Sequence, residues 1–178
     1  DLFPFYLRCR SINERASRVS QTPVKKPATS ETVEPVTLWN TMTNAKRWIE
    51  ALRLSRHPEG GWFREVYRSN ETIPHRSLPT RFAGDRPFST AIYFLLEETE
   101  VSVLHRIQQD EVWHFYDGGR LTIHNFDTEG SYSKGTLGRC VDDGDRLMFI
   151  VQAGTLFGAT VETSDYVLAG CTVAPGFD

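Results

Sequence analysis

Long hydrophobic runs and a strong excess of one charge are both missing from this sequence. No stretch approaches the roughly 18–20 consecutive apolar residues that cross a membrane as a helix, so we expect a soluble protein without membrane contact. The 178 residues carry a formal net charge of −3. This slight acidity argues against nucleic acid as a partner, because a nucleic-acid binder normally presents a basic stripe.

Cysteine is also scarce, with three residues in the chain. Cys9, Cys140 and Cys171 show none of the short spacings of a zinc site, and an odd number does not make a disulfide framework. We therefore expect reduced thiols and a cytoplasmic protein. Cys171 has no cationic neighbour in the sequence, which predicts a buried, unreactive thiol rather than a nucleophile.

Long helical patterns are absent, and one short helix is readable. Apolar residues recur at helical spacing over Asn44–Leu54, with Thr43 or Asn44 available as the N-cap. The helix should end before His57 and Pro58, because a proline disfavours helical geometry in the residue that precedes it.

The remainder of the chain alternates short β-branched or aromatic runs with Gly, Asp or Asn. These runs predict eight strands: Trp62–Ser69, Ser89–Leu96, Val101–Ile107, Glu111–Tyr116, Leu121–Phe126, Arg146–Val151, Leu156–Val161 and Tyr166–Val173. Strands at this spacing after one leading helix predict an all-β fold, with a closed or sandwiched antiparallel sheet.

The first 35 residues differ from the rest of the chain. Six basic side chains and a single acidic one lie between Arg8 and Lys26. We interpret residues 1–35 as an N-terminal extension and residues 36–178 as one domain. Organelle targeting is the alternative role for the extension, because targeting segments share this basic, acid-poor composition.

The segment from Val101 to Gly118 carries the most informative side chains. If its two strands form a hairpin in which His105 pairs with Glu111, one face holds apolar residues and this His–Glu pair. An inward carboxylate must be paired, protonated or bound to a ligand. The pair is therefore a general acid–base dyad, half of a metal site, or a structural pair in the hairpin.

This segment resembles the first motif of the cupin superfamily at His105, Glu111 and Gly118. Four blocks resemble one cupin family of unknown function with an RmlC-like jelly roll: His57–Glu65, Ser89–Leu96, Asp110–Tyr116 and Gly170–Phe177. The resemblance implies a double-stranded β-helix, the cupin jelly roll, with a short N-terminal helix. It implies no activity, because one fold hosts many functions.

Departures from the superfamily's pattern bear on metal binding. The second His of the first motif is replaced by Ile107, and the ligand His of the second motif by Phe157. The superfamily's four ligands thus reduce to His105 and Glu111, whereas zinc, iron or manganese sites use three or four protein ligands. We expect no cofactor; a metal held partly by His105 and Glu111 is the alternative.

A mechanism without metal resembles that of the sugar-nucleotide epimerases of the rhamnose pathway, distant relatives in this fold. These enzymes use His and Tyr to move a proton next to a carbonyl group. By this analogy His105 is the base, Glu111 orients it, and Tyr67 or Tyr93 is the acid.

Four further residues are candidates for ligand binding: Arg64, Trp113, Gln152 and Phe157. Arg64 offers a guanidinium to an anion, although ion pairing with nearby carboxylates is the favoured alternative. Trp113 also suits the core. Gln152 and Phe157 replace the residues that cupins usually have near the barrel mouth. His57, just before a proline, suits a turn or a subunit contact.

The sequence therefore predicts a cupin that binds an unidentified small molecule, with metal-independent isomerase or epimerase chemistry. The alternatives are a non-catalytic binding or storage-like cupin and a metal-dependent oxygenase or decarboxylase. We also expect a homodimer, partly from the resemblance and partly because exposed strand edges need cover.

Overall fold

The computed structural model describes residues 43–178, so the extension predicted for residues 1–35 and its boundary lie outside the described part. The chain begins there with helix α2 (Asn44–Ala51). Thr43 is its N-cap, and its hydroxyl accepts a hydrogen bond from the backbone N–H of Lys46 at 3.4 Å. The helix ends before the predicted Leu54; Arg53 has a left-handed φ of 52°, and Ser55–Arg56 pair with the next strand.

The all-β prediction is confirmed by the elements that follow the helix. The strands are β1 (Ser55–Arg56), β2 (Trp62–Arg68), β3 (Thr72–Ile73), β4 (Arg86–Pro87), β5 (Thr90–Glu97), β6 (Val101–His105), β7 (Asp110–Phe126), β8 (Tyr132–Leu137), β9 (Met148–Val151) and β10 (Leu156–Ala174). Short 3₁₀ turns lie at His75–Ser77 and Val141–Asp143. Two predicted pairs of strands are in fact the single long strands β7 and β10, and the strands β1, β3, β4 and β8 were not predicted.

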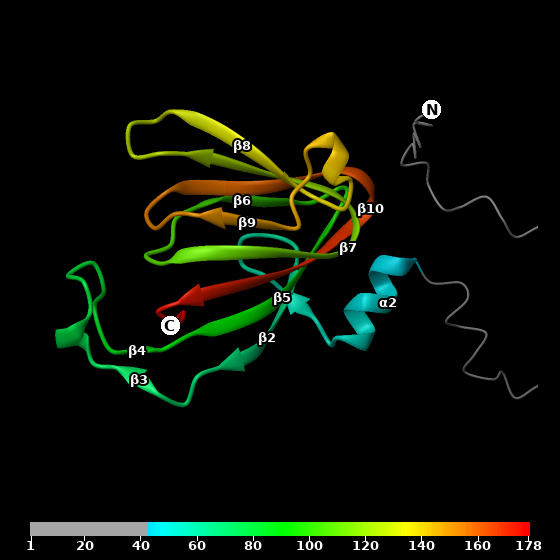
Figure 1. The fold of residues 1–178 in the computed structure, drawn as a ribbon. Helices are drawn as coiled ribbons and strands as arrows, with labels where there is room; N and C mark the ends of the chain where they lie inside the picture. Colours follow the sequence, from blue (N-terminus) through cyan, green and yellow to red (C-terminus); the bar gives the residue numbers. More distant parts are fainter. Residues whose placement is uncertain (1–42) are drawn as a thin grey trace, which may run out of the picture. The chain divides into compact units, whose positions relative to one another are not determined.

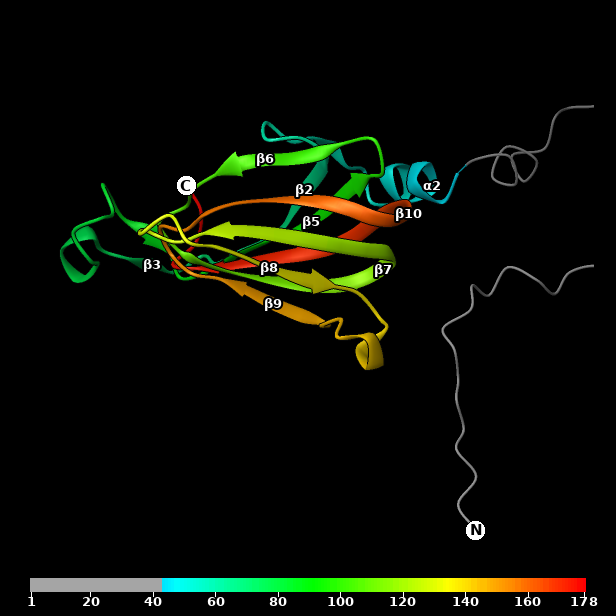
Figure 2. The ribbon, with the colours of Figure 1, turned by 90° about the horizontal axis from the view of Figure 1, so that it is seen from above.

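β7 and β10 take part in both layers of a jelly roll (Figures 1 and 2). In one layer the first half of β10 lies between β6 and the second half of β7, which also pairs with β8. In the other layer the second half of β10 lies between β5 and the first half of β7, which also pairs with β9. Register shifts on either side of Thr163 mark the change of layer, as bulges bend strands and increase their twist.

The predicted hairpin between β6 and β7 is wrong. His105 on β6 pairs with Phe157 of β10, and Glu111 on β7 pairs with Val151 of β9 and Val173 of β10. The two segments are adjacent in sequence but belong to different layers. β6 pairs with the first half of β10, whereas the start of β7 pairs with the second half of β10. His105 and Glu111 therefore come from opposite layers of the sandwich rather than from one hairpin.

Alternation along β5 separates two apolar clusters. Phe94 and Leu96 point between the layers and join the main core with residues such as Ile123 and Phe157. Leu95 points outward and packs under α2 with Ala45 and other residues. α2 lies at one end of the strands and the β3–β4 pair at the other (Figure 1). The helix thus covers only part of the outer face.

A polar cluster around Asp117 of β7 fastens α2 to the strands. The Oδ2 atom of Asp117 accepts hydrogen bonds from the Tyr166 hydroxyl at 2.6 Å and the Trp48 indole N–H at 3.1 Å. Its Oδ1 atom accepts one from Arg139 at 3.0 Å. Burial raises the pKa of Tyr166 to about 12, with the Asp117 carboxylate contributing. Because each oxygen has a partner, this carboxylate is a structural group.

No helix within residues 43–178 has the length and apolar character needed to span a membrane.

Candidate functional site

A cavity of about 220 Å³ opens between the two layers. Its lining is mostly apolar, with a few polar side chains. The lining residues are His57, Pro58, Glu59, Phe63, Glu65, Thr90, Ile92, Phe94, Ser102, His105, Ile107, Glu111, Trp113, Cys171, Val173 and Phe177. Small-molecule sites in proteins have this character, an apolar surface with a few convergent polar groups.

The turn between β1 and β2 carries two of the polar groups, His57 and Glu59. The backbone N–H of His57 donates to the Gly61 carbonyl at 3.0 Å, and the Glu59 carbonyl accepts from the Val103 N–H of β6 at 2.8 Å. Gly60 has a φ of +100°, and a Cβ there would lie 2.1 Å from the Val101 carbonyl oxygen. Only glycine permits this close approach, which holds the turn against the strand that carries His105.

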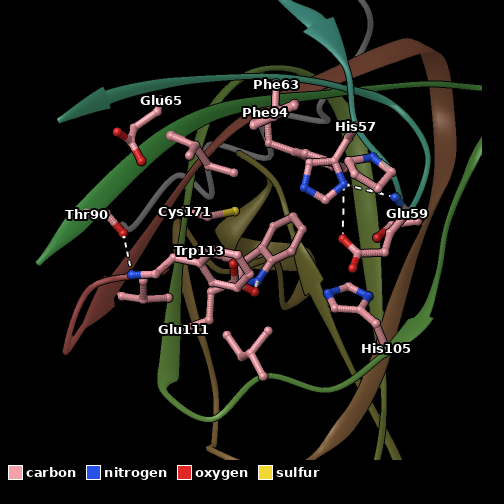
Figure 3. Close-up of a pocket in the computed structure, with 16 residues that line it drawn as sticks. His57, Glu59, Phe63, Glu65, Thr90, Phe94, His105, Glu111, Trp113 and Cys171 are labelled. Atoms are coloured by element: carbon pink, nitrogen blue, oxygen red, sulfur yellow. Dashed lines mark hydrogen bonds and ion pairs between the residues drawn. The ribbon is translucent and has the colours of Figure 1, made fainter. Parts of the chain in front are cut away.

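His57, Glu59 and His105 form the polar rim of the cavity. The Nδ1 atom of His57 lies 3.1 Å from Glu59 Oε2, and the Glu59 carboxylate lies between the two imidazole rings (Figure 3). Burial lowers the pKa of His57, helped by His105 and opposed by Glu59. His57 is therefore mainly neutral at neutral pH.

His105 has a defined tautomer. Its Nδ1 lies 2.7 Å from the Val103 carbonyl oxygen, and a carbonyl can only accept, so Nδ1 carries a proton. In the neutral ring Nε2 is then the atom that can take up a proton. The imidazole packs against Phe157, with ring centroids 4.1 Å apart, which limits its rotation.

Glu111 is the deep acid of the cavity. Burial raises the pKa of Glu111 to about 7; hydrogen bonds from Trp113 and Cys171 oppose this rise, and the Glu59 carboxylate adds to it. The Trp113 indole N–H donates to Glu111 Oε2 at 2.8 Å. Both hydrogen-bond donors are neutral, so no positive charge compensates the buried carboxylate. Near neutral pH the protonated and ionised forms are therefore both populated.

Cys171 faces the same acid from β10. Burial raises the pKa of the Cys171 thiol well above its ordinary value, and the adjacent Glu111 carboxylate raises it further. The thiol thus stays protonated and serves as a hydrogen-bond donor. This agrees with the predicted unreactive thiol, but the side chain contributes to the cavity wall.

The structure brings together three of the predicted site residues, His105, Glu111 and Trp113, in the cavity lining. Phe157 is fully buried behind His105. Gln152 is exposed outside the cavity lining, in the turn that follows β9.

Arg64, Tyr67 and Tyr93 also lie outside the cavity lining. Arg64 donates to the Leu52 carbonyl at 2.8 Å. Tyr67 is 53% exposed, and Tyr93 packs on the outer face, with its ring centroid 6.0 Å from that of Tyr116. The analogy that made Tyr67 or Tyr93 the acid therefore has no geometric support.

His57 and Glu59 are site residues that sequence reasoning did not assign to the site. The available signal was the His–Pro–Glu–Gly–Gly run at 57–61, in which two acid–base side chains precede two glycines. Such a turn places its polar side chains at the end of a sheet, but the sequence does not show which strand the turn will contact.

The donor set of the cavity does not fit a tightly bound metal ion. No three His, Cys, Asp or Glu side chains within residues 43–178 are grouped to hold one. The thiol of Cys171 is protonated and hydrogen-bonded to Glu111, and Phe157, where the resemblance implies a ligand His, is fully buried.

Comparison with protein families matches residues 46–178 to the model described as Cupin superfamily (DUF985). The chain belongs to this cupin family. The resemblance noted in the sequence is thereby confirmed, and so is the cupin jelly roll. A comparison with curated proteins finds no match.

Two solved structures are similar to this one over most of their length. A Shewanella oneidensis protein is 38% identical, over 77% of this chain and 81% of that chain, with a TM-score of 0.68. A hypothetical protein from Leishmania major is 32% identical, over 76% of this chain and 84% of that chain, with a TM-score of 0.69. Neither description states an activity, so the function of this cupin must be argued from its cavity.

Proposed function

We propose that this cupin binds a small, mainly apolar molecule in the cavity and moves a proton on it without a metal. The supporting observation is that Glu111, with a pKa of about 7, shares an apolar cavity with His105. A group whose pKa lies near the working pH is the most effective general acid or base. This is the isomerase- or epimerase-type chemistry expected from the sequence, but the acid is Glu111 instead of a tyrosine.

The two groups have complementary roles in the proposed reaction. Nε2 of His105 takes a proton from carbon next to a carbonyl group, and protonated Glu111 donates a hydrogen bond to the carbonyl oxygen. The imidazolium then returns the proton to a second carbon of the enolate's conjugated system, which shifts the double bond and completes the isomerisation. The Glu59 carboxylate, which lies between the two imidazole rings, stabilises the transient positive charge on His105. Tyrosine has no part in this scheme.

The test starts from whatever small molecule stays bound through purification, extracted and identified by mass spectrometry. Incubated with the protein in D₂O, that molecule should exchange a carbon-bound proton for deuterium. We expect His105→Ala to slow the exchange at least ~100-fold, the usual scale for a lost general base, with a nearly unchanged thermal midpoint. A bound molecule without exchange would favour the non-catalytic binding cupin instead.

The expected homodimer stays a proposal, supported by apolar side chains on the outer face of β9. Met148 and Ile150 are 53% and 56% exposed there, and within residues 43–178 the strand β9 pairs with β7 alone. Light scattering after size-exclusion chromatography measures the mass directly. A monomer at micromolar concentration would contradict the proposal.

A further inference from the structure

A second hollow, of about 260 Å³, adjoins the cavity. Ile107 and Phe177 belong to the walls of both spaces. Phe177 is held in place by its own backbone, whose N–H donates to the Thr90 hydroxyl and whose carbonyl accepts from Arg68, both at 2.9 Å. A molecule that fills the cavity therefore needs only a short extension past Phe177 to reach the second hollow.

Arg86 on β4 forms the buried side of the second hollow. It is 9% exposed, and its guanidinium carbon lies 5.7 Å from the ring centroid of Phe82. Its Nη1 is 3.3 Å from a carboxylate oxygen of Asp178. Within residues 43–178, its buried Nε has no hydrogen-bond partner. A buried donor without a partner is unfavourable, so this guanidinium is only partly satisfied.

Arg106 supplies a second guanidinium to the same hollow. It is exposed, and its Nη1 donates to the Gly154 carbonyl at 2.6 Å. Among the described wall residues of the hollow, Asp178 provides the sole carboxylate, and its side chain is 77% exposed. Its pairing with Arg86 shows that this guanidinium binds a carboxylate.

The two spaces differ in charge. The cavity wall carries the carboxyl groups of Glu59, Glu65 and Glu111, of which Glu65 is paired with Arg68, whereas the second hollow carries two guanidinium groups and the Asp178 carboxylate. An anionic group would be repelled from the first space and attracted to the second. The apolar part of the same molecule would prefer the first space, which is lined by aromatic and aliphatic side chains.

We propose that the ligand of the cavity is a small carboxylic acid, with its apolar body in the cavity and its carboxylate bound by Arg86 and Arg106. The inference rests on the proposed function and adds the class of ligand. Guanidinium groups bind carboxylates through paired, charge-assisted hydrogen bonds. The ligand's carboxylate takes the place beside Arg86 that the exposed Asp178 side chain holds in the structure.

Two probes of equal length distinguish the binding contribution of the apolar body from that of the carboxylate. They are 4-phenylbutyrate and its neutral counterpart 4-phenyl-1-butanol. Isothermal calorimetry at pH 7.5 and low salt should show that the wild type binds the acid at least ten-fold more tightly than the alcohol. Arg106→Gln should remove most of this preference and leave alcohol binding unchanged. Asp178→Asn should strengthen acid binding, because it removes the competing carboxylate.

Arg47→Gln is the matched control, since Arg47 is an exposed residue of α2 and its loss changes the net charge equally. It should leave the preference intact. Equal binding of acid and alcohol, or a preference that survives Arg106→Gln, would overturn the carboxylate inference and leave the cavity proposal standing. If the wild type binds neither probe, the proposed apolar binding cavity fails, and the inference fails with it.

Discussion

Two acidic residues of β7, Glu111 and Asp117, lie six positions apart, and their surroundings shift their pKa values in opposite directions. Burial would raise the pKa of Asp117, but hydrogen bonds from Tyr166, the Gly118 backbone, Trp48 and Arg139 together lower it below its ordinary value. Glu111 has neutral donors and no cation, and burial raises its pKa to about 7.

The difference teaches which carboxylate has a structural role and which is available for chemistry. Asp117 favours the ionised form that its donors stabilise, so its charge contributes to stability. Glu111 is ionised at a cost to the folded state, and proteins commonly keep such groups where a function needs them. One strand therefore carries a structural acid beneath the helix and a proton-exchanging acid in the cavity.

The largest effect should come from Glu111→Gln, which removes the costly ionisation. Between the unfolded pKa of about 4.3 and the folded pKa of about 7, the folded wild type binds more protons than the unfolded chain. Its stability therefore falls as pH rises through this window. Glu111→Gln should be more stable than the wild type at pH 8, by up to about 4 kcal/mol, and nearly equal at pH 4.

Urea denaturation at pH 4 and pH 8 measures this change. Glu98→Gln provides a matched control, because it makes the same substitution at an exposed position. If the Glu111→Gln variant shows the same difference from wild type at both pH values, the proposed ionisation of Glu111 is wrong.

Asp117→Asn should show the opposite sign with a smaller magnitude. The amide accepts the bonds from Tyr166 and Trp48 less strongly, and we expect a loss of about 2 kcal/mol at pH 7, typical of hydrogen bonds to a charged group. Because the folded pKa of Asp117 is lowered, this stabilisation is full above pH ~4 and is lost as pH falls through the folded pKa. A stability difference that does not change between pH 7 and pH 2 would contradict the comparison.

The smallest change tests the hydrogen bond from Trp113. Trp113→Phe removes a donor that favours ionised Glu111, so the pKa of Glu111 should rise further above its value of about 7. Trp62→Phe is the control, since the Trp62 indole donates at 3.0 Å to Glu97 instead. A carboxyl titration of the two variants by NMR measures the shift. An unchanged Glu111 pKa in Trp113→Phe would show that this hydrogen bond does not affect the ionisation of Glu111.

The sequence contained the fold and part of the site. Alternating strands and the cupin-like blocks predicted the jelly roll, and the apolar face expected within residues 101–118 predicted an inward His105 and Glu111. The pairing behind that prediction was wrong, because strand partners are set by contacts far apart in the chain. β10 lies between β6 and β7 and pairs with both. No residue pattern within 101–118 predicts that a distant strand is inserted there.

The prediction that Tyr67 or Tyr93 supplies the acid of the site failed for reasons local to each strand. In β2, alternation correctly groups Phe63 and Glu65 on the cavity side, but a register shift between Glu65 and Tyr67 interrupts the pattern. Tyr93 lies between the inward Ile92 and Phe94, so alternation along β5 turns it outward. Bulges depend on the partner strand, and one sequence read alone does not show them.

The most direct test of the account is the titration of Glu111 itself. Carboxyl carbons of ¹³C-labelled glutamate, followed by NMR from pH 4 to pH 9, can be assigned by the resonance that disappears in Glu111→Gln. We predict that this resonance titrates near the value of about 7 given by its burial. A midpoint near the ordinary glutamate value of about 4.3 would show that Glu111 is a fully solvated carboxylate and would contradict the proposed acid–base role.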